Sequence, residues 1–368
     1  MDSVQPEAKT SLRQHIGCPA VELIDTLPAS TYLRTPAKFV EYIGDCANKD
    51  AYTAHYHNNI ACLPEQGLYR IFDAEVRGKG IITIDGMLVE DNLEGAPLDR
   101  VADNLAREPD AEKCIDEPVL YITRFGVKNY GHCLTDIIPR ILRFHEILPD
   151  VKIALHPEMP AQIIDLLAIS GITDSECIKL GDEHVRIKTM YFMSLWNKHP
   201  LVHSPVTFSY IDSIKRSVID NSKVATNTYP PKIFAGRKQD ASGRQIINYK
   251  EVAQLLSSHD YVEIASGEMS FSEQVKQFSS AKSVVGIAGA AMTNILFCPP
   301  DTPVLALAPD SMPALYYWDM AHHAKLHYGI AYFSTGRKPA LKNQGNSIFA
   351  DFEVDLAVLE SLINKINR

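Results

Sequence analysis

Short apolar runs alternate with segments of helical periodicity between Lys232 and Ala308. The pattern predicts strands at 232–235, 261–264, 283–288 and 304–308, and helices at 249–258, 271–280 and 292–297. Strands separated by helices pair in parallel, because each helix returns the chain to the edge where the next strand begins. The second half of the chain is therefore predicted to form an α/β domain with a doubly wound parallel sheet.

Some helices in this half carry boundary signals of their own. Asn248 and Glu251 have the spacing of a capping box, in which side chains satisfy the free amides of a helix start. Ser270 and Glu273 repeat that spacing. Apolar side chains at helical spacing predict an amphipathic helix at the end of the chain: Phe352, Leu356, Leu359, Ile363 and Ile366. This helix must bury its apolar face against the domain.

The first half of the chain also mixes strand and helix patterns. Residues 81–84 and 87–89 flank Asp85-Gly86, which predicts a hairpin with a type I′ turn. Strands are predicted at 119–122, 151–155, near 178 and at 185–190, and helices at 37–43, after Asn129 and at 161–169. The first half is thus also expected to be α/β, with the hairpin decorating its edge.

A chain of 368 residues is long enough for two domains of roughly 150 residues each. The stretch 221–231 is polar, turn-rich and without periodicity, which predicts a linker. We therefore place the domains at 1–222 and 223–368. Two such domains would face each other across a cleft, with ligands at the carboxyl ends of the strands.

Composition removes several classes of protein. The 46% hydrophobic and 22% charged residues are typical of a globular protein, and the net charge of −9 disfavours nucleic acid as a partner. Seven scattered cysteines without a Cys-x-x-Cys pair indicate neither a disulfide framework nor a zinc ribbon. Without a signal peptide or an apolar run of about 20 residues, we expect a cytoplasmic protein that does not span the membrane.

Three polar side chains share one face of the helix expected after residue 128. Asn129, His132 and Asp136 follow one another at spacings of three and four. An imidazole beside a carboxylate is suited to general base catalysis, because the carboxylate fixes the tautomer and stabilises the imidazolium. Pro139 lacks an amide, so the helix is expected to kink there or to begin just before it. The alternative interpretation is a solvated helix face.

A basic turn follows the strand predicted at 232–235. Arg237, Lys238 and Arg244 place three cations within eight residues, next to Gly236. Arginine offers paired donors that match phosphate oxygens, so this segment suits an anionic ligand. A solvated loop is the alternative.

The strand predicted at 283–288 runs into small residues and a helix start. Gly289 and Ala290 allow a close approach of the backbone, and helix-start amides up to Thr293 and Asn294 attract phosphate. The segment lacks the third glycine of the dinucleotide fingerprint and follows the third strand of its domain. A nicotinamide cofactor is therefore disfavoured.

Several other catalytic patterns are missing from the sequence. It contains no Gly-x-Ser-x-Gly, no Walker loop and no Asp-x-Asp pair after a strand. His322, His323 and His327 lack a carboxylate or cysteine that would complete a metal set. We expect neither a metal nor a cofactor.

In order and spacing, the three candidate segments resemble glycosyltransferase family 61, whose bacterial members are often capsular polysaccharide biosynthesis proteins. The resemblance spans about residues 68–309. It rests on Asn129-x-x-His132-x-x-x-Asp136, on Gly236-Arg237 with Arg244-x-Ile-x-Asn248, and on Gly289-Ala-Ala-Met-Thr-Asn294 with Phe297-Cys-Pro-Pro-Asp-Thr302. Ala288 and Ala306 depart from the family pattern, which usually has His and Glu at these positions.

The resemblance implies a GT-B-like fold of two Rossmann-type domains and inverting transfer from a nucleotide sugar without a metal. The acceptor would bind 1–222 and the donor 223–368. The expected catalytic residues are His132 and Asp136. The expected substrate-binding residues are Asn129, Arg237, Lys238, Arg244, Gly289, Ala290, Thr293 and Asn294.

Three hypotheses follow. The leading one is a cytoplasmic glycosyltransferase of polysaccharide biosynthesis, with peripheral association at the inner membrane face left open. Its partners would be a nucleotide sugar and an oligosaccharide or glycolipid. The second is a degenerate relative that binds glycan or nucleotide as a partner subunit, which Ala288 and Ala306 favour. The third, a dinucleotide-dependent oxidoreductase, is disfavoured by the glycine spacing.

Overall fold

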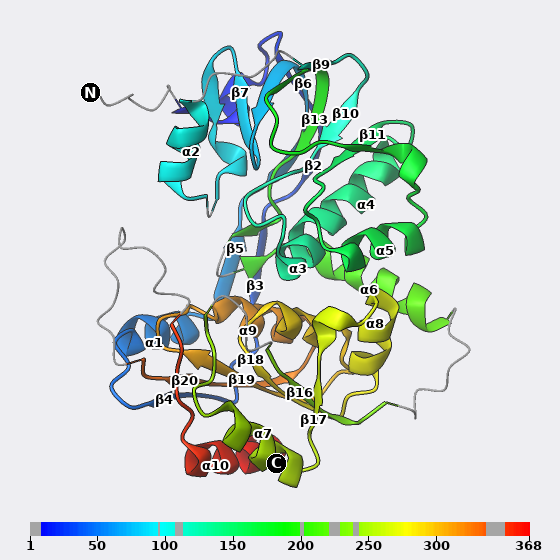
Figure 1. The fold of residues 1–368 in the computed structure, drawn as a ribbon. Helices are drawn as coiled ribbons and strands as arrows, with labels where there is room; N and C mark the ends of the chain where they lie inside the picture. The colour runs from blue at the N-terminus through cyan, green and yellow to red at the C-terminus, as the bar shows by residue number, and fades with distance from the viewer. Residues whose placement is uncertain are drawn as a thin grey trace. The chain divides into compact units, whose positions relative to one another are not determined.

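The structure of the protein is a computed structural model that describes residues 9–94, 96–106, 113–198, 202–220, 229–237, 243–335 and 350–368. The described residues form two compact units. The first unit takes its residues from Met1–Ser30, Cys62–His199 and His203–Ile211, and the second from Thr31–Ala61, Pro200–Val202 and Asp212–Arg368. Both units combine helices with a large sheet (Figure 1).

Ten strands of the described residues form a mixed sheet in the first unit. Its parallel strands are β13 (Val185–Met193), β10 (Val119–Tyr121), β11 (Lys152–Leu155) and β12 (Cys177–Lys179). Its antiparallel strands are β2 (Val21–Leu27), β6 (Gln66–Arg77), β7 (Ile81–Ile84) and β8 (Met87–Val89). The short strands β1 (Lys9–Thr10) and β9 (Lys113–Ile115) pair in parallel with β8 and β13.

The helices of the first unit include α2 (Leu98–Leu105), α4 (Ile138–Ile147) and α5 (Ala161–Ile169). Short 3₁₀ turns lie at Leu12–His15, Glu90–Asn92 and Asp174–Glu176. Helix α6 (Pro205–Asp220) begins in the first unit and ends in the second. The predicted strands at 119–122, 151–155, 178 and 185–190 and the helix at 161–169 are confirmed.

The hairpin formed by β7 and β8 is also confirmed. Ile84 pairs with Met87, and the two turn residues Asp85 and Gly86 have φ values of 49° and 75°. Both values are left-handed, as a type I′ turn requires. The hairpin lies between β6 and β1 within the main sheet, so it is more than a decoration at the edge.

The second unit contains a six-stranded sheet in which every described pair is parallel. Its order is β17 (Val262–Ile264), β16 (Lys232–Ala235), β18 (Ser283–Ile287), β19 (Pro303–Pro309), β20 (His327–Phe333) and β4 (Phe39–Ile43). Its helices are α1 (Lys49–His57), α7 (Tyr249–Ser258), α8 (Phe271–Ser279), α9 (Leu315–His323) and α10 (Leu356–Ile366), with 3₁₀ segments η6 (Ser266–Glu268) and η7 (Ala290–Phe297). The doubly wound parallel sheet predicted from the sequence is confirmed.

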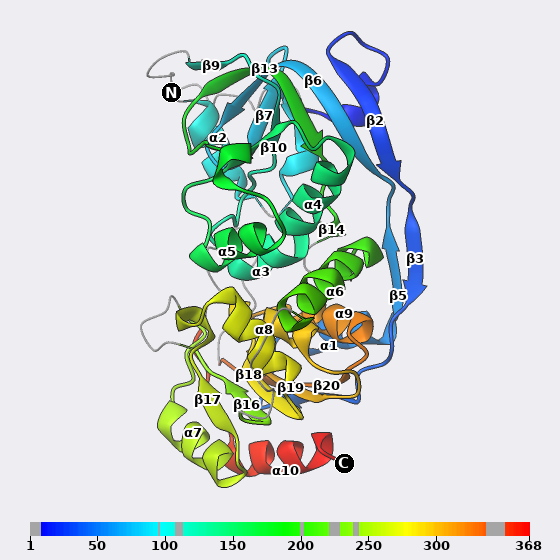
Figure 2. The ribbon, with the colours of Figure 1, turned by 90° about the vertical axis from the view of Figure 1, so that its right-hand side faces the viewer.

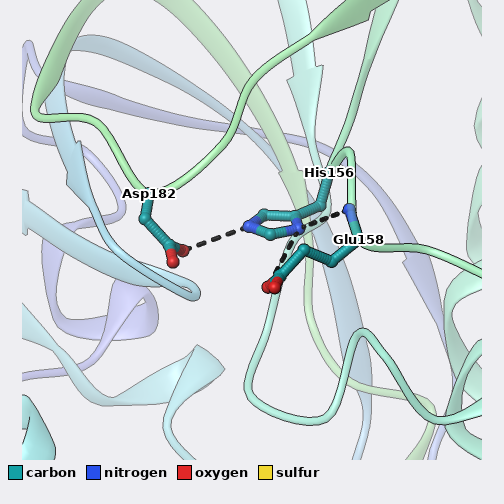
Figure 3. Close-up of side chains that lie close together, drawn as sticks. All are labelled: His156, Glu158 and Asp182. Atoms are coloured by element: carbon teal, nitrogen blue, oxygen red, sulfur yellow. Dashed lines mark hydrogen bonds and ion pairs between the residues drawn. The ribbon is translucent and has the colours of Figure 1, made fainter.

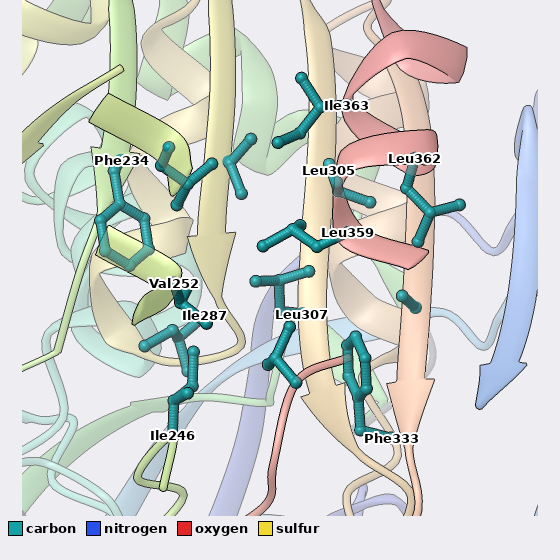
Figure 4. Close-up of a cluster of buried hydrophobic side chains, with 14 of the residues drawn as sticks. Phe234, Ile246, Val252, Ile287, Leu305, Leu307, Phe333, Leu359, Leu362 and Ile363 are labelled. Atoms are coloured by element: carbon teal, nitrogen blue, oxygen red, sulfur yellow. The ribbon is translucent and has the colours of Figure 1, made fainter. Parts of the chain in front are cut away.

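Helices cover both faces of this parallel sheet. Helices α7 and α10 lie on one face, and α8 and α9 lie on the other (Figure 2). Apolar side chains fill the space between the sheet and the pair α7 and α10 (Figure 4). Leu359 and Ile363 of α10 are among them, so the predicted C-terminal helix buries its apolar face as expected.

The prediction of a helix at 37–43 is wrong, because Phe39–Ile43 forms strand β4. Phe39 pairs with Gly329 of β20, and a side chain at Gly329 would collide with the Phe39 ring. The free edge of β20 thus decides the conformation of this segment. Residues 31–61 accordingly belong to the second unit, whereas the boundary expected at residue 222 placed them in the first domain. Residues 221–228 of the expected linker lie outside the described residues.

The two expected capping boxes have different outcomes. Ser270 accepts a hydrogen bond from the Glu273 amide, and Glu273 accepts one from the Ser270 amide, so this box is confirmed. Asn248 makes no side-chain cap, because its amide group bonds both the N–H and the carbonyl of Val354.

Two small sheets complete the described strands: β3 (Ser30–Leu33) with β5 (Ile60–Leu63), and β14 (Asn197–Lys198) with β15 (Val202–His203). None of the described helices has both the length and the apolar content needed to cross a membrane.

Candidate active site

The first candidate segment starts with Asn129 as the N-cap of a helix. Its side-chain oxygen accepts hydrogen bonds from the amides of Gly131 (2.8 Å) and His132 (3.4 Å). Such a cap satisfies amides that the helix itself leaves free. Asn129 therefore sets the conformation of the turn that carries His132.

The helix continues past Pro139 through a π turn. Helix α3 (Tyr130–His132) leads into the π segment η3 (Cys133–Ile137) and then into α4. In an α-helix the carbonyl of Thr135 would accept a bond from the amide that Pro139 lacks. Here that carbonyl accepts a bond from the Thr207 hydroxyl (3.4 Å). A wide turn thus takes the place of the expected kink or late start, and such turns are frequent at functional sites.

Asp136, in the π turn, is fully buried between two guanidinium groups. Its Oδ2 accepts hydrogen bonds from Arg140 (2.6 Å) and Arg124 (2.9 Å), which are themselves buried. Its Oδ1 accepts a bond from the Trp196 amide (3.1 Å). We refer to Asp136, Arg124 and Arg140 as the Asp136 cluster. The cluster ties the motif helix to two distant segments of the first unit.

The charges of the Asp136 cluster determine how Asp136 ionises. Burial by itself would raise the pKa of Asp136, but the charges of Arg140 and Arg124 outweigh burial and lower the pKa to about 2. A carboxylate with so low a pKa is a weak proton acceptor near neutral pH. The geometry therefore favours a positioning role for Asp136 over the role of a base.

His132 is half-buried, and its imidazole lies against the backbone of Gly126. Gly126 has a φ of 90°, and a Cβ there would lie 2.9 Å from the ring carbon Cδ2. A glycine is required at this position both by the backbone and by the ring. The hydrogen bonds that hold Asp136 come from Arg124, Arg140 and the Trp196 backbone, so the structure does not pair its carboxylate with His132.

In the second unit, the basic turn and the small-residue segment meet at one edge of the sheet. Strands β16 and β18 pair in parallel, so the segments that follow them emerge side by side. A Cβ on Gly289 would lie 3.0 Å from the Arg237 guanidinium, and Arg244 donates a hydrogen bond to the Ala288 carbonyl (3.2 Å). The structure therefore brings Arg237, Arg244 and Gly289 together.

This edge of the sheet carries a concentrated positive charge. Burial lowers the pKa of Arg237, and the charge of Arg244 lowers it further. The buried Nε of Arg237 has no hydrogen-bond partner among the described residues. Tyr317 donates its hydroxyl to the Gly289 carbonyl (2.7 Å) and holds the turn in place. Lys238, the third expected cation, lies outside the described residues.

Only the first residues of the small-residue segment lie at the sheet edge that carries Arg237 and Arg244. Ala290 opens the 3₁₀ segment η7, with Gly289 as its N-cap, and is partly exposed. Thr293 and Asn294 are fully buried, and the Asn294 amide donates to the Gln274 side chain (2.7 Å). Their surroundings favour internal packing of η7 over contact with a ligand.

Comparison with known proteins identifies this combination of segments. Residues 130–305 match the family model described as Glycosyltransferase 61. This segment is similar to glycosyltransferase family 61. The match includes His132 and Asp136 in the first unit and Arg237, Arg244 and Gly289 in the second, and it makes the protein a glycosyltransferase enzyme. No curated protein matches the chain.

The two departures from the family pattern lie inside the residues that the family model matches or directly after them. Ala288 follows β18, Ala306 lies in the adjacent strand β19, and both side chains are fully buried. The backbone of Ala288 nevertheless helps to position Arg244, because its carbonyl accepts a hydrogen bond from the Arg244 guanidinium.

A group of potential metal ligands lies elsewhere in the first unit (Figure 3). His156 Nε2 lies 3.1 Å from Asp182, and His156 Nδ1 accepts a hydrogen bond from the Glu158 amide (3.1 Å). Glu158 also forms ion pairs with Lys79 (2.5 Å) and Lys128. Because both lysines compensate its charge, the group is better explained as a surface charge network than as a site of the glycosyltransferase reaction.

The hydrogen-bond partners of Asp136 were not predicted from the sequence. Arg140 lies four residues after Asp136, a spacing that indicates an ion pair on a helix, and it could have been found. Arg124 precedes Asp136 by twelve residues and Trp196 follows it by 60, with no local pattern that links them. Only the folded chain brings them to Asp136.

Proposed function

We propose that this glycosyltransferase is an inverting, metal-independent enzyme of the GT-B class that moves a sugar from a nucleotide-sugar donor to a glycan acceptor in polysaccharide biosynthesis. The observation that carries the proposal is the pair Arg237 and Arg244 beside Gly289, inside a glycosyltransferase 61 domain.

The donor diphosphate would bind at this pair. Arg237 is partly buried and its Nε lacks a partner among the described residues, so a phosphate oxygen would satisfy a group that burial otherwise penalises. Guanidinium groups also stabilise the charge that develops on a leaving diphosphate. This supports transfer without a metal, because the countercharge comes from side chains.

His132 would act as the general base. It would accept the proton of an acceptor hydroxyl while the hydroxyl oxygen attacks the anomeric carbon of the donor sugar. The bond from that carbon to the nucleoside diphosphate breaks in the same step, and one displacement inverts the anomeric configuration. Asp136 would position the helix that carries His132, since its own carboxylate is held by arginines.

A cytoplasmic location fits the chemistry of the cysteines, and we include it in the proposal. All seven cysteines of the chain are free thiols in the structure. Secreted proteins usually use cysteines for disulfides, whereas a reducing compartment keeps thiols free.

One observation favours a second candidate, a binding protein without transfer activity. The Asp136 carboxylate accepts hydrogen bonds from Arg124 and Arg140, which favours a structural role for the carboxylate of the motif. Such a protein would bind a nucleotide sugar or a glycan and leave the donor intact.

The deciding experiment supplies the purified protein with nucleotide sugars and glycan acceptors and follows product formation by NMR. We expect an inverted anomeric configuration, and we expect His132→Asn to lower turnover by about two to four orders of magnitude. His145→Asn, a histidine on α4 that pairs with Glu176, is the matched control and should leave turnover unchanged. Product with retained configuration would refute the inverting mechanism, and binding without transfer would support the second candidate.

A further inference from the structure

A cavity of about 470 Å³ lies within the first unit, at the ends of β5 and β6 and beside β14. Its volume lies in the range of about 300–1,000 Å³ that is usual for ligand sites. None of the residues expected from the sequence to bind substrate lines it. The cavity therefore shares no lining residue with the basic edge of the second unit.

Asn197 presents an unused hydrogen-bond donor at the wall of this cavity. Its side chain is only 5% exposed, and its Oδ1 accepts a hydrogen bond from Arg124 Nη1 (3.2 Å). Arginine can only donate, so this contact fixes which end of the amide faces Arg124. The NH₂ group is left without a partner among the described residues. This donor is therefore available to an acceptor in the cavity that Asn197 lines.

The Asp136 cluster holds this donor in place. The same Arg124 nitrogen that donates to Asn197 also donates to Asp136 Oδ2 (2.9 Å), and Arg124 Nη2 donates to the Glu94 carbonyl (3.0 Å). Asn197 and Glu94 both line the cavity. The motif carboxylate thus acts, through one buried guanidinium, on two segments of the cavity wall.

Hydrogen-bond acceptors dominate the rest of the wall. Four carboxylates, those of Glu65, Glu90, Asp91 and Glu94, line the cavity, against the two cations Arg13 and Lys198. Arg13 is paired with Glu65 (2.7 Å), and Glu90 is paired with Lys9 (3.3 Å). Such a wall repels an anionic ligand and offers many acceptors to hydroxyl groups.

An aromatic side chain completes the wall. Tyr69 is buried to 2% exposure and lines the cavity together with Leu63. A sugar ring has apolar faces of C–H groups and an equatorial belt of hydroxyls, so it matches a wall that combines an aromatic side chain with acceptors. A phosphate or a uronate would instead meet a wall in which carboxylates outnumber cations.

We propose that this cavity binds an uncharged, hydroxyl-rich sugar residue of the acceptor glycan, with the Asn197 amide as donor and the wall carboxylates as acceptors. The assignment to the acceptor rests on the proposed function. Binding of the sugar itself rests on the cavity alone. Asp136 then has a defined task in substrate recognition, because it positions Asn197 through Arg124.

The test uses an array of purified neutral and uronic-acid oligosaccharides, followed by calorimetric titration of the sugars that bind. We expect the full-length protein to bind neutral sugars, and Asn197→Asp to weaken that binding about tenfold or more, because the variant keeps the shape and loses the donor. Asn104→Asp on α2, outside the cavity, is the matched control. Glu94→Gln serves as a second cavity variant in case Asn197→Asp fails to fold, and it too should weaken binding.

The outcomes separate this inference from the proposed function. Preference for uronic acids, no binding to any sugar, or unchanged binding in a folded Asn197→Asp variant overturns the cavity assignment, even if the enzyme transfers sugar. Neutral sugar binding that depends on Asn197, in a protein that transfers nothing from any donor, upholds the cavity and refutes the enzyme. In an active enzyme, Asn197→Asp should raise the acceptor KM and leave the affinity for the nucleotide-sugar donor unchanged.

Discussion

The carboxylate of Asp136 accepts hydrogen bonds from Arg124 and Arg140 inside the first unit. Its replacement by an amide would leave two guanidinium groups buried without a counter-charge. We expect Asp136→Asn to lower the free energy of unfolding by about 3–5 kcal/mol, as for other broken buried ion pairs. Urea unfolding measures this loss. Asp103→Asn, at an exposed site on α2, is the control, and a loss no larger than in the control would contradict the structural role.

The pH dependence of the same variant checks the sign of the effect. Asp136 has a pKa of about 2 in the folded protein, below the ordinary value of about 3.9 for an unfolded chain. Its stabilising contribution is therefore complete above pH ~4 and is lost as the pH falls toward about 2. The difference in unfolding free energy between wild type and Asp136→Asn should narrow below pH ~4. A difference that widens with acid would contradict the cluster.

Arg237 allows a test of the donor site at the level of one side chain. Arg237→Ala removes a charge-assisted contact worth about 1.5–3 kcal/mol, so the affinity for the nucleoside diphosphate of the donor should fall about ten- to a hundredfold. Arg244→Ala should act in the same direction, since Arg244 lies at the same edge. Arg216→Ala, at an exposed position on α6, controls for lost charge. Calorimetric titration of the nucleotide into each variant measures the effect. If Arg237→Ala binds with wild-type affinity, the phosphate site lies elsewhere.

At the scale of elements, the segment η7 is held against β18 by a glycine. Gly286 is buried, and a Cβ there would collide with Met292 of η7 and lie 3.0 Å from the Ala235 Cβ. We expect Gly286→Ala to cost about 1–3 kcal/mol of stability through overpacking and to weaken UDP binding, because η7 begins at Gly289. Thermal unfolding and titration measure the two effects.

Gly267 supplies the control for this prediction. It lies in η6, and a Cβ there would meet no atom within 4 Å. Gly267→Ala should therefore change stability by no more than about 0.5 kcal/mol. Equal effects of the two substitutions would show that the packing of η7 is not the cause.

At the scale of the whole molecule, the proposal makes the catalytic reaction independent of divalent metal. Arg237 and Arg244 would provide the countercharge for the diphosphate, so transfer should continue in excess chelator at an undiminished rate. The assay compares initial rates with and without chelator, and then with added magnesium or manganese. Complete loss of activity that either ion restores would contradict a site built from guanidinium groups.

Local patterns determined much of this architecture. The strands β16 to β19 and the helices α7 and α8 of the second unit were predictable, because a buried strand and an amphipathic helix each leave a periodicity in their own residues. Asp85-Gly86 and the Ser270 capping box were predictable for the same reason, since the groups that interact lie within four residues. The order of the candidate segments along the chain also sufficed to indicate the family.

Long-range contacts decided the rest. The segment 39–43 is a strand because it pairs with the edge of β20. Asn248 does not form the expected helix cap because its side chain bonds the backbone of Val354 instead. The sequence predicts His132 and Asp136 on one helix. In the folded chain the Asp136 carboxylate accepts a hydrogen bond from Arg124. The cavity beside β14, which we propose to bind sugar, likewise depends on residues from several distant segments. Such partners are chosen by burial and charge in the folded chain, and no spacing along the sequence encodes them.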